Sequence, residues 1–145
     1  MTIAHKKQEK HYSCAAACAG MVLGVEEKEA RKLCKTKYTG TKFNNLLLGL
    51  KEKGLRAKKI EINNDYKAVL IHLNLLSDNY PVLMSCKFIS RYNQKGRDNV
   101  RHHAVLISKR MVYDPGESFE APSDAVEHSF NKNLYVKQII IVGID

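Results

Sequence analysis

The sequence lacks the long apolar run that a membrane-spanning helix requires. No stretch of its 145 residues approaches the roughly 18 consecutive apolar residues of such a span. The first ten residues, MTIAHKKQEK, are polar and contain no apolar region of the kind found in a cleavable signal peptide. We therefore predict a cytoplasmic location, or delivery into a target cell without a cleavable signal peptide.

The sequence also lacks the paired spacing of cysteines and histidines that marks structural zinc sites. Its four cysteines, Cys14, Cys18, Cys34 and Cys86, form no C-x-x-C pair, and no two histidines stand in an H-x-x-x-H pattern. We expect reduced thiols, as is usual for a cytosolic chain, and neither a metal nor a cofactor. Each cysteine is then a core side chain or a reactive group, and we expect Cys18, Cys34 and Cys86 to be core thiols.

A concentrated run of positive charge is missing too, although the net charge is +9 and the pI is near 9.4. Lys and Arg are spread over segments such as HKKQEK, RKLCKTK and KEKGLRAKK, and no single basic helix or Arg-rich tail stands out. This distribution favours a solvated basic surface over nucleic-acid binding. A nucleic-acid binder remains an alternative, and its affinity would fall steeply with salt.

What is present is the composition of one globular domain. The apolar fraction is 44%, the charged fraction is 27%, and 145 residues suffice for a single domain with a real core. We see no internal repeats and no low-complexity tract. Helical patterns come first and mostly antiparallel strands follow, which predicts an α+β fold in which one domain spans residues 1–145.

Apolar periodicity and turn residues predict the individual elements. Helices are predicted over residues 13–24, 26–35, 40–54 and 65–79, and strands over 55–62, 80–89 and 134–144, with two further strands within 101–116 joined by a turn at Ser108–Arg110. Residues 65–79 also fit a strand, although we favour the helix. Residues 90–99 are predicted to form a polar loop, and residues 123–130 one or two helical turns. Ser13 is expected to cap the first helix, with Gly24 ending it.

Four side chains that lie far apart in the sequence have the chemistry of a nucleophilic cysteine site. Cys14 begins a predicted helix, where the free N–H groups and the helix dipole lower the pKa of a thiol. His103 begins a strand and Asp114 ends the next one, so that a base and the group that orients it can converge at one rim of the sheet. Gln8 precedes Cys14 by six residues, where its amide could join the Cys14 backbone N–H at an oxyanion.

These residues resemble the motifs of the C39 peptidases. This papain-like family is best known as the N-terminal domains of bacteriocin-exporting ABC transporters, which cut leader peptides after a Gly-Gly pair. The pattern Q-x5-C-x2-A-x3-M is followed by H-x-V in a strand and by D-P after the next strand, and the resemblance covers nearly the whole chain. It implies a papain-like fold, with an N-terminal helical part packed on an antiparallel sheet. It also implies Cys14 as nucleophile, His103 as base, Asp114 as the residue that orients the base, and Gln8 in the oxyanion hole.

Two features distinguish this sequence from the usual family pattern. Ala15 stands where the family has Gly directly after the cysteine, and no ABC or membrane domain follows, which suggests a stand-alone or effector form. His102 also competes with His103 for the role of base, because neighbouring strand residues point to opposite faces. We favour His103, and the short interval from His103 to Asp114 then requires a tight hairpin.

We therefore predict a cysteine peptidase with a Cys-His-Asp triad that cleaves after a Gly-Gly motif in a protein or peptide. Papain-like toxins used between bacteria have a similar size and basic charge, so an effector acting on a cytosolic target protein is one form of this prediction. An inhibitor or immunity protein would then be a partner, and nucleic acid is not expected to be one. The alternatives are a glutamine deamidase or acyltransferase with the same triad, and a non-catalytic C39-like module that binds peptides.

Overall fold

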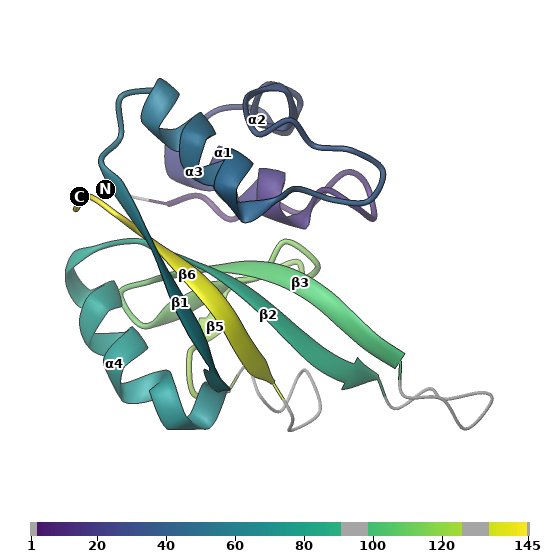
Figure 1. Cartoon of the computed structure of the whole chain (residues 1–145). Helices are drawn as coiled ribbons and strands as arrows, with labels where there is room; N and C mark the ends of the chain where they lie inside the picture. The colour runs from purple at the N-terminus through teal and green to yellow at the C-terminus, as the bar shows by residue number, and fades with distance from the viewer. Residues whose placement is uncertain (1–2, 91–98, 126–133, 145) are drawn as a thin grey trace.

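The computed structural model describes residues 3–90, 99–125 and 134–144, and within them four helices and a six-stranded sheet. The helices are α1 (Cys14–Leu23), α2 (Glu27–Leu33), α3 (Phe43–Glu52) and α4 (Tyr66–Asn79). The strands are β1 (Ala57–Asp65), β2 (Val82–Ser90), β3 (Asn99–Ser108), β4 (Met111–Tyr113), β5 (Ala121–Pro122) and β6 (Tyr135–Val142). The sheet order is β1-β6-β2-β3-β4-β5 and every neighbouring pair is antiparallel, as predicted for the α+β class (Figure 1).

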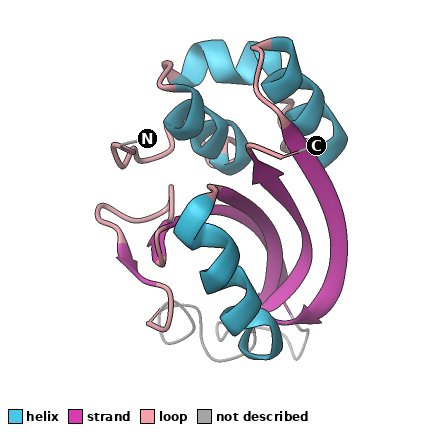
Figure 2. Cartoon of the chain, turned by 90° about the vertical axis from the view of Figure 1, so that its left-hand side faces the viewer, coloured by secondary structure: helices cyan, strands magenta, loops and turns pink. Residues whose placement is uncertain are grey.

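The sheet separates two apolar cores. On one side α1, α2 and α3 form a layer whose core includes Leu46, Leu50 and the sheet residue Leu106. On the other side α4 packs through Tyr66 and Leu73 against a second core. Figures 1 and 2 show the three N-terminal helices above the sheet, which bends around α4. The N-terminal helices thus meet the sheet along a single boundary, and this boundary carries the site described below.

Helix α1 is the innermost helix because nearly all of its residues are small and apolar. Residues 15–22 are buried, so the helix has no polar face. It ends as predicted at Gly24, whose φ of 68° and ψ of 31° place it in the left-handed region that favours glycine. The predicted side-chain cap at Ser13 is wrong: no such hydrogen bond forms, because the Ser13 hydroxyl instead meets Oε1 of the buried Glu27 at 3.0 Å.

A tight hairpin joins β3 to β4 at the predicted turn. Ser108 pairs with Met111, and both intervening residues have positive φ, 49° at Lys109 and 62° at Arg110, as a two-residue turn of this hand requires. The end of α4 fixes this turn, since the Ser77 carbonyl accepts the Lys109 N–H at 2.7 Å and its hydroxyl accepts the Arg110 N–H at 3.0 Å. The short hairpin brings residue 114 back alongside the middle of β3, next to His103.

The remaining predictions for elements had mixed outcomes. The helical interpretation of residues 65–79 is confirmed as α4, whereas the two-residue strand β5 was not predicted. Residues 91–98 of the predicted loop at 90–99 and residues 126–130 of the predicted helical turns at 123–130 fall outside the described residues, and residues 123–125 form a turn. No helix in the described part of the chain is long and apolar enough to cross a membrane.

Candidate active site

Cys14 is the first residue of α1, at the boundary where this helix packs against β3. Its side chain is half-buried, and burial alone would raise the pKa of the thiol. The hydrogen bond and positive charge of His103 outweigh that effect, helped by the backbone groups of Ala104 and Ala15, and the pKa is lowered from its ordinary value. Cys14 is therefore a thiol whose surroundings favour the thiolate.

His103 lies between Cys14 and Asp114. Its Nε2 is 2.6 Å from Asp114 Oδ1, and the two side chains are only 15% and 7% exposed. Burial would lower the pKa of the imidazole, but the hydrogen bond to Asp114 and the contact with Cys14 raise it to about 9. Because Nε2 is bound to Asp114, Nδ1 is the ring nitrogen left for the thiol. The opposite pKa shifts favour a thiolate–imidazolium pair near neutral pH.

The backbone around Asp114 is held by the N-terminal segment. Asp114 Oδ1 also accepts the Gly116 N–H at 2.8 Å, which fixes the carboxylate in its own turn. The Asp114 carbonyl lies 2.8 Å from His5 Nε2, and the Pro115 carbonyl accepts the Gln8 N–H at 2.8 Å. No sequence pattern indicated a role for His5, because its partner lies 109 residues away. The N-terminal segment thus anchors Asp114, the residue that hydrogen-bonds to the imidazole of His103.

Gln8 lies at the rim of a hollow that His103 and Asp114 also line. Its side-chain Nε2 donates a hydrogen bond of 2.7 Å to the Lys10 carbonyl, which engages one of its two N–H bonds. The second N–H remains for another acceptor. The structure therefore brings Gln8 to the same region as His103, and its predicted contribution to an oxyanion hole stays a prediction.

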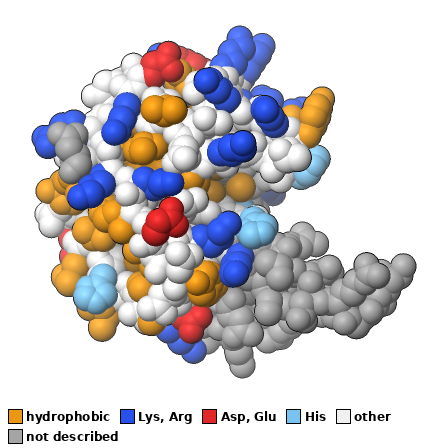
Figure 3. All heavy atoms as spheres, viewed as in Figure 1, with side chains coloured by type: hydrophobic (Ala, Val, Ile, Leu, Met, Phe, Trp, Pro, Cys, Tyr) orange, Lys and Arg blue, Asp and Glu red, His pale blue; other side chains and the backbone are white. Residues whose placement is uncertain are grey.

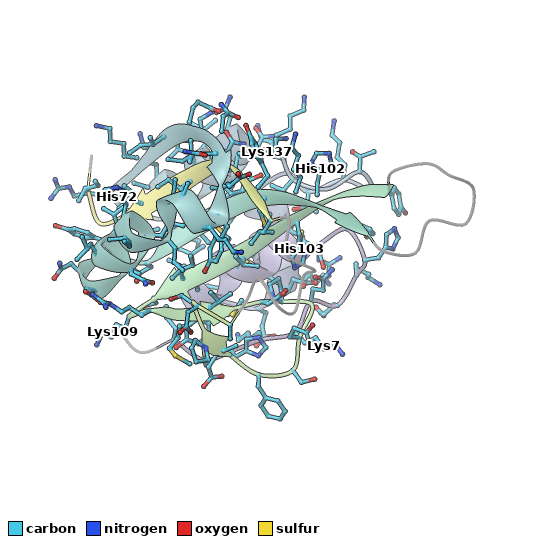
Figure 4. All side chains as sticks on the ribbon, turned by 90° about the horizontal axis from the view of Figure 1, so that it is seen from below. Lys7, His72, His102, His103, Lys109 and Lys137 are labelled. Atoms are coloured by element: carbon cyan, nitrogen blue, oxygen red, sulfur yellow. The ribbon has the colours of Figure 1, made fainter. Side chains whose placement is uncertain are left out.

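The two neighbouring histidines differ in what they contact. His103 pairs in register with Cys86 and His102 with Lys87, and their side chains leave opposite faces of β3 (Figure 4). His102 is exposed, whereas His103 contacts both Cys14 and Asp114. The structure thus brings together Cys14, His103 and Asp114, and leaves His102 beside them.

The other three thiols are core groups, as predicted. Cys18, Cys34 and Cys86 are all fully buried, and no disulfide forms among the four cysteines. Burial raises the pKa of Cys34 to about 11 and also raises those of Cys18 and Cys86. Cys14 is therefore the one cysteine whose surroundings favour ionisation. Among the residues that the structure describes, no cluster of three or more His, Cys, Asp or Glu could hold a metal ion.

Two hollows flank the contact between Cys14 and His103. The first, which we call the thiol hollow, has a volume of about 270 Å³ and is lined by Cys14 and His103 together with Tyr12, Tyr38 and Phe43. Its walls are mainly aromatic and small side chains. A peptide bond placed here would lie next to the sulfur atom.

The second hollow, which we call the polar hollow, has a volume of about 460 Å³. His103 and Asp114 line it together with Gln8, Lys10 and Glu117, and Cys14 does not. The imidazole of His103 therefore borders both hollows, with the sulfur atom on one side only. Chemically, this arrangement suits a reaction in which one product stays bonded to the sulfur and the other leaves past the imidazole.

Comparisons with known proteins identify the family of the chain and structures with a similar fold. Residues 2–83, more than half of the chain, match the model of a family described as the peptidase C39 family. No curated protein sequence matches.

Two solved structures are similar over 99% of this chain. One is a double glycine motif protease from an AMS/PCAT transporter in complex with the leader peptide, with 16% identity, 93% of that chain covered and a TM-score of 0.62. The other is the peptidase domain of Streptococcus ComA, a bifunctional ABC transporter involved in quorum sensing, with 17% identity, 100% of that chain covered and a TM-score of 0.64. These similarities confirm the predicted papain-like fold.

Proposed function

Because the chain belongs to the peptidase C39 family, we propose that it is a cysteine peptidase that uses Cys14 to cleave a peptide chain after a Gly-Gly pair. One observation carries the proposal: the thiol of Cys14 and the carboxylate of Asp114 both contact the imidazole of His103. A lowered thiol pKa next to a raised imidazole pKa is the electrostatic state that nucleophilic cysteine catalysis needs.

In the proposed mechanism, the Cys14 thiolate attacks the carbonyl carbon of the scissile bond and the carbonyl oxygen becomes an oxyanion. The backbone N–H of Cys14 and the free N–H of Gln8 would donate hydrogen bonds to that oxygen. The imidazolium of His103 then gives its proton to the leaving amine, and a thioester remains. Neutral His103 next takes a proton from water, whose oxygen attacks the thioester and releases the acid. Asp114 keeps the imidazole oriented throughout.

The preference for Gly-Gly is supported by the shape of the thiol hollow. Tyr12, Tyr38 and Phe43 line the hollow beside the sulfur, and we propose that their rings limit the room for side chains immediately before the cut. Ala15, which departs from the family pattern, is only 5% exposed and belongs to the core under α1. Ala15 nevertheless lines the thiol hollow, so its methyl group borders the space that the substrate would occupy, and we propose that a single methyl group there leaves the same specificity.

The substrate class that we favour is a peptide of the leader type. A similar protease is known in complex with a leader peptide, and the two hollows form an open site that an extended chain could cross. An effector that cuts an exposed Gly-Gly loop in a cytosolic target protein, with an immunity protein as its inhibitor, is a second form of the proposal. Its motivation is the net charge of +9. In either form we propose that residues 1–145 act as one peptidase domain.

The decisive experiment combines a Gly-Gly peptide with mass spectrometry of the intact products. We expect two fragments separated after the second Gly, and a loss of several orders of magnitude in rate for Cys14→Ala. Cys34→Ala, which removes a buried thiol away from the site, is the matched control and should keep the activity. A peptide that gains about one dalton without being cut would instead indicate the deamidase alternative. Full cleavage by Cys14→Ala would overturn the proposal.

A further inference from the structure

A third hollow, outside the proposed catalytic residues, is walled by positive charge. Lys28, Arg31, Lys32 and Lys35 line it together with Tyr12 and Thr36, and its volume is about 360 Å³. Lys28, Arg31 and Lys32 stand at positions i, i+3 and i+4 and so share one face of α2, and Lys35 lies two residues beyond the end of this helix. We call this feature the cationic hollow.

Three of these cations have no acidic partner among the residues that the structure describes. Arg31 is half-buried and faces Glu27 at 3.4 Å and Glu9 at 3.8 Å. Lys28, Lys32 and Lys35 are exposed, and none of them makes an ion pair within the part of the chain that the structure describes. Clustered exposed cations produce a positive potential that attracts an acidic ligand. Figure 3 shows the same excess of Lys and Arg over acids on one face of the molecule.

The cationic hollow adjoins the thiol hollow. Tyr12 lines both of them, and its ring meets the exposed ring of Tyr38 edge-on with 5.3 Å between the centroids. Thr36 of the cationic hollow hydrogen-bonds to Thr41 of the thiol hollow, with 2.7 Å between their hydroxyl oxygens. A peptide that leaves the thiol hollow over these rings therefore arrives at the lysines.

The position of the sulfur sets which part of the substrate takes this path. In the proposed reaction the acyl part of the substrate becomes bonded to Cys14, which lines the thiol hollow and not the polar hollow. The leaving amine takes its proton from His103 and departs on the side of the polar hollow. Residues that precede the Gly-Gly pair therefore extend from the thiol hollow toward the cationic hollow.

We propose that the cationic hollow binds Asp or Glu side chains that precede the Gly-Gly pair, which makes the preferred substrate an acidic peptide segment. This inference rests on the proposed peptidase function and adds a charge requirement to it. Because Lys28, Lys32 and Lys35 are exposed, each contact is weak, and selectivity arises from several of them acting together. The effect is expected on KM, since the contacts lie away from the reacting atoms and are equal in the ground and transition states.

The test uses peptides that differ only in charge. One Gly-Gly peptide carries a pair of Asp residues before the Gly-Gly pair, a second carries Asn in their place, and a third carries the Asp pair after the cut. In further peptides the Asp pair is moved one residue at a time along the segment before the cut and along the segment after it. We expect kcat/KM to be about tenfold higher for the best upstream Asp peptide than for its Asn counterpart, through KM. High salt should reduce this ratio. If kcat/KM is the same for the Asp and Asn peptides at every upstream position, or if downstream Asp is preferred, the inference is wrong.

Variants of the enzyme supply the matched controls. Lys28→Glu/Lys32→Glu should lose the preference for upstream Asp and should instead favour a peptide with upstream Lys. Lys51→Glu/Lys58→Glu changes the net charge equally at exposed positions elsewhere and should keep the original preference. If both double variants lose the preference alike, only the net charge matters and the cationic hollow is not the site.

A further variant separates binding from folding. Lys35 has a φ of 53°, in the region that favours glycine, so Lys35→Gly removes one cation while relaxing the backbone. It should reduce the preference without lowering the melting temperature. An unchanged preference in this variant and in Lys28→Glu/Lys32→Glu overturns the inference.

Two outcomes distinguish this inference from other readings. If no peptide is cleaved at all and Cys14 reacts as an ordinary thiol, the peptidase proposal fails rather than the charge requirement. If the lysine substitutions abolish the binding of a single-stranded oligonucleotide but leave peptide preference unchanged, the hollow serves nucleic acid and the inference is wrong.

Discussion

At the scale of single residues, the site depends on the contact between one thiol and one imidazole. The pKa of Cys14 is lowered although burial alone would raise it, and the pKa of His103 is raised to about 9 although burial alone would lower it. The lowered pKa of Cys14 therefore depends mainly on His103, and the raised pKa of His103 depends on Asp114 and Cys14. Between the lowered thiol pKa and about pH 9, the thiolate and the imidazolium coexist.

We predict that alkylation of Cys14 proceeds at a pH below the ordinary thiol range, and that His103→Ala removes this reactivity. Without the imidazole, burial is the dominant effect and the pKa of Cys14 should rise above its ordinary value. The measurement is the rate of iodoacetamide labelling against pH, with the labelled residue identified by mass spectrometry. His102→Ala is the matched control and should leave the profile unchanged. A wild-type profile like that of a free thiol would contradict the proposed pair.

A second prediction concerns Asp114→Asn. This change removes the carboxylate that holds His103 protonated, so the pKa of His103 should fall from about 9 toward its ordinary 6.5. The alkaline limb of the rate profile should then move to lower pH.

The protonated imidazole stabilises the fold fully below pH 6.5, and this contribution is lost as the pH rises through about 9. Asp114→Asn should therefore be less stable than the wild type below about pH 9, with the full difference reached below pH 6.5. Measurements of kcat/KM and of the melting temperature against pH test both statements, and an unmoved alkaline limb would contradict the assignment.

At the scale of elements, α2 holds the segment that connects Gln8 to Cys14. The buried Glu27 Oε1 accepts the Glu9 N–H at 2.9 Å and meets the Ser13 hydroxyl at 3.0 Å. Arg31 lies 3.4 Å from the other oxygen of the same carboxylate. One acidic side chain thus fixes both ends of a short irregular segment. The sequence predicted a Ser13 cap because a serine directly before a helix often accepts a hydrogen bond from a backbone N–H of its first turn. The prediction could not include the competing carboxylate of Glu27, which lies fourteen residues further along the chain.

We predict that Glu27→Ala lowers both stability and activity. The change leaves the Glu9 N–H and Ser13 hydroxyl without this acceptor and leaves Arg31 without a buried partner, which should cost about 2 to 4 kcal/mol of unfolding free energy. Denaturant unfolding measures this loss. Below the unfolding transition, kcat should still be reduced, because the segment before Cys14 is loosened.

The matched control for this prediction is Glu29→Ala on the same helix. Glu29 is exposed and pairs with Lys53 at 3.0 Å, so its loss should change the unfolding free energy by less than about 1 kcal/mol. Equal effects of the two substitutions on kcat would show that Glu27 has no special role in holding the site.

At the scale of the whole molecule, the site exists only where two layers meet. The helices, the long strands and the β3–β4 turn were predictable, because apolar spacing and turn residues are local signals. The chemistry of Cys14 and His103 and their places in predicted elements made them candidates, but pairing them required the family resemblance, since no local pattern joins residues so far apart. The bond from His5 to the Asp114 carbonyl and the strand β5 had no signal at all: the first is long-range, and the second has only two residues.

The two cores should therefore contribute differently to function. Leu106 and Leu73 are both almost fully buried, but Leu106 belongs to the core between the N-terminal helices and the sheet, and Leu73 to the core under α4. We predict that Leu106→Ala and Leu73→Ala each lower the unfolding free energy by about 2 to 5 kcal/mol. Only Leu106→Ala should also raise the pKa of Cys14 and reduce kcat under conditions where the protein remains folded, because the cavity loosens the packing of α1 on β3. Denaturant unfolding gives the first quantity and pH-dependent thiol labelling the second. If Leu73→Ala shifts the thiol pKa as much as Leu106→Ala does, the site depends on the sheet as a whole and not on the boundary between the two layers.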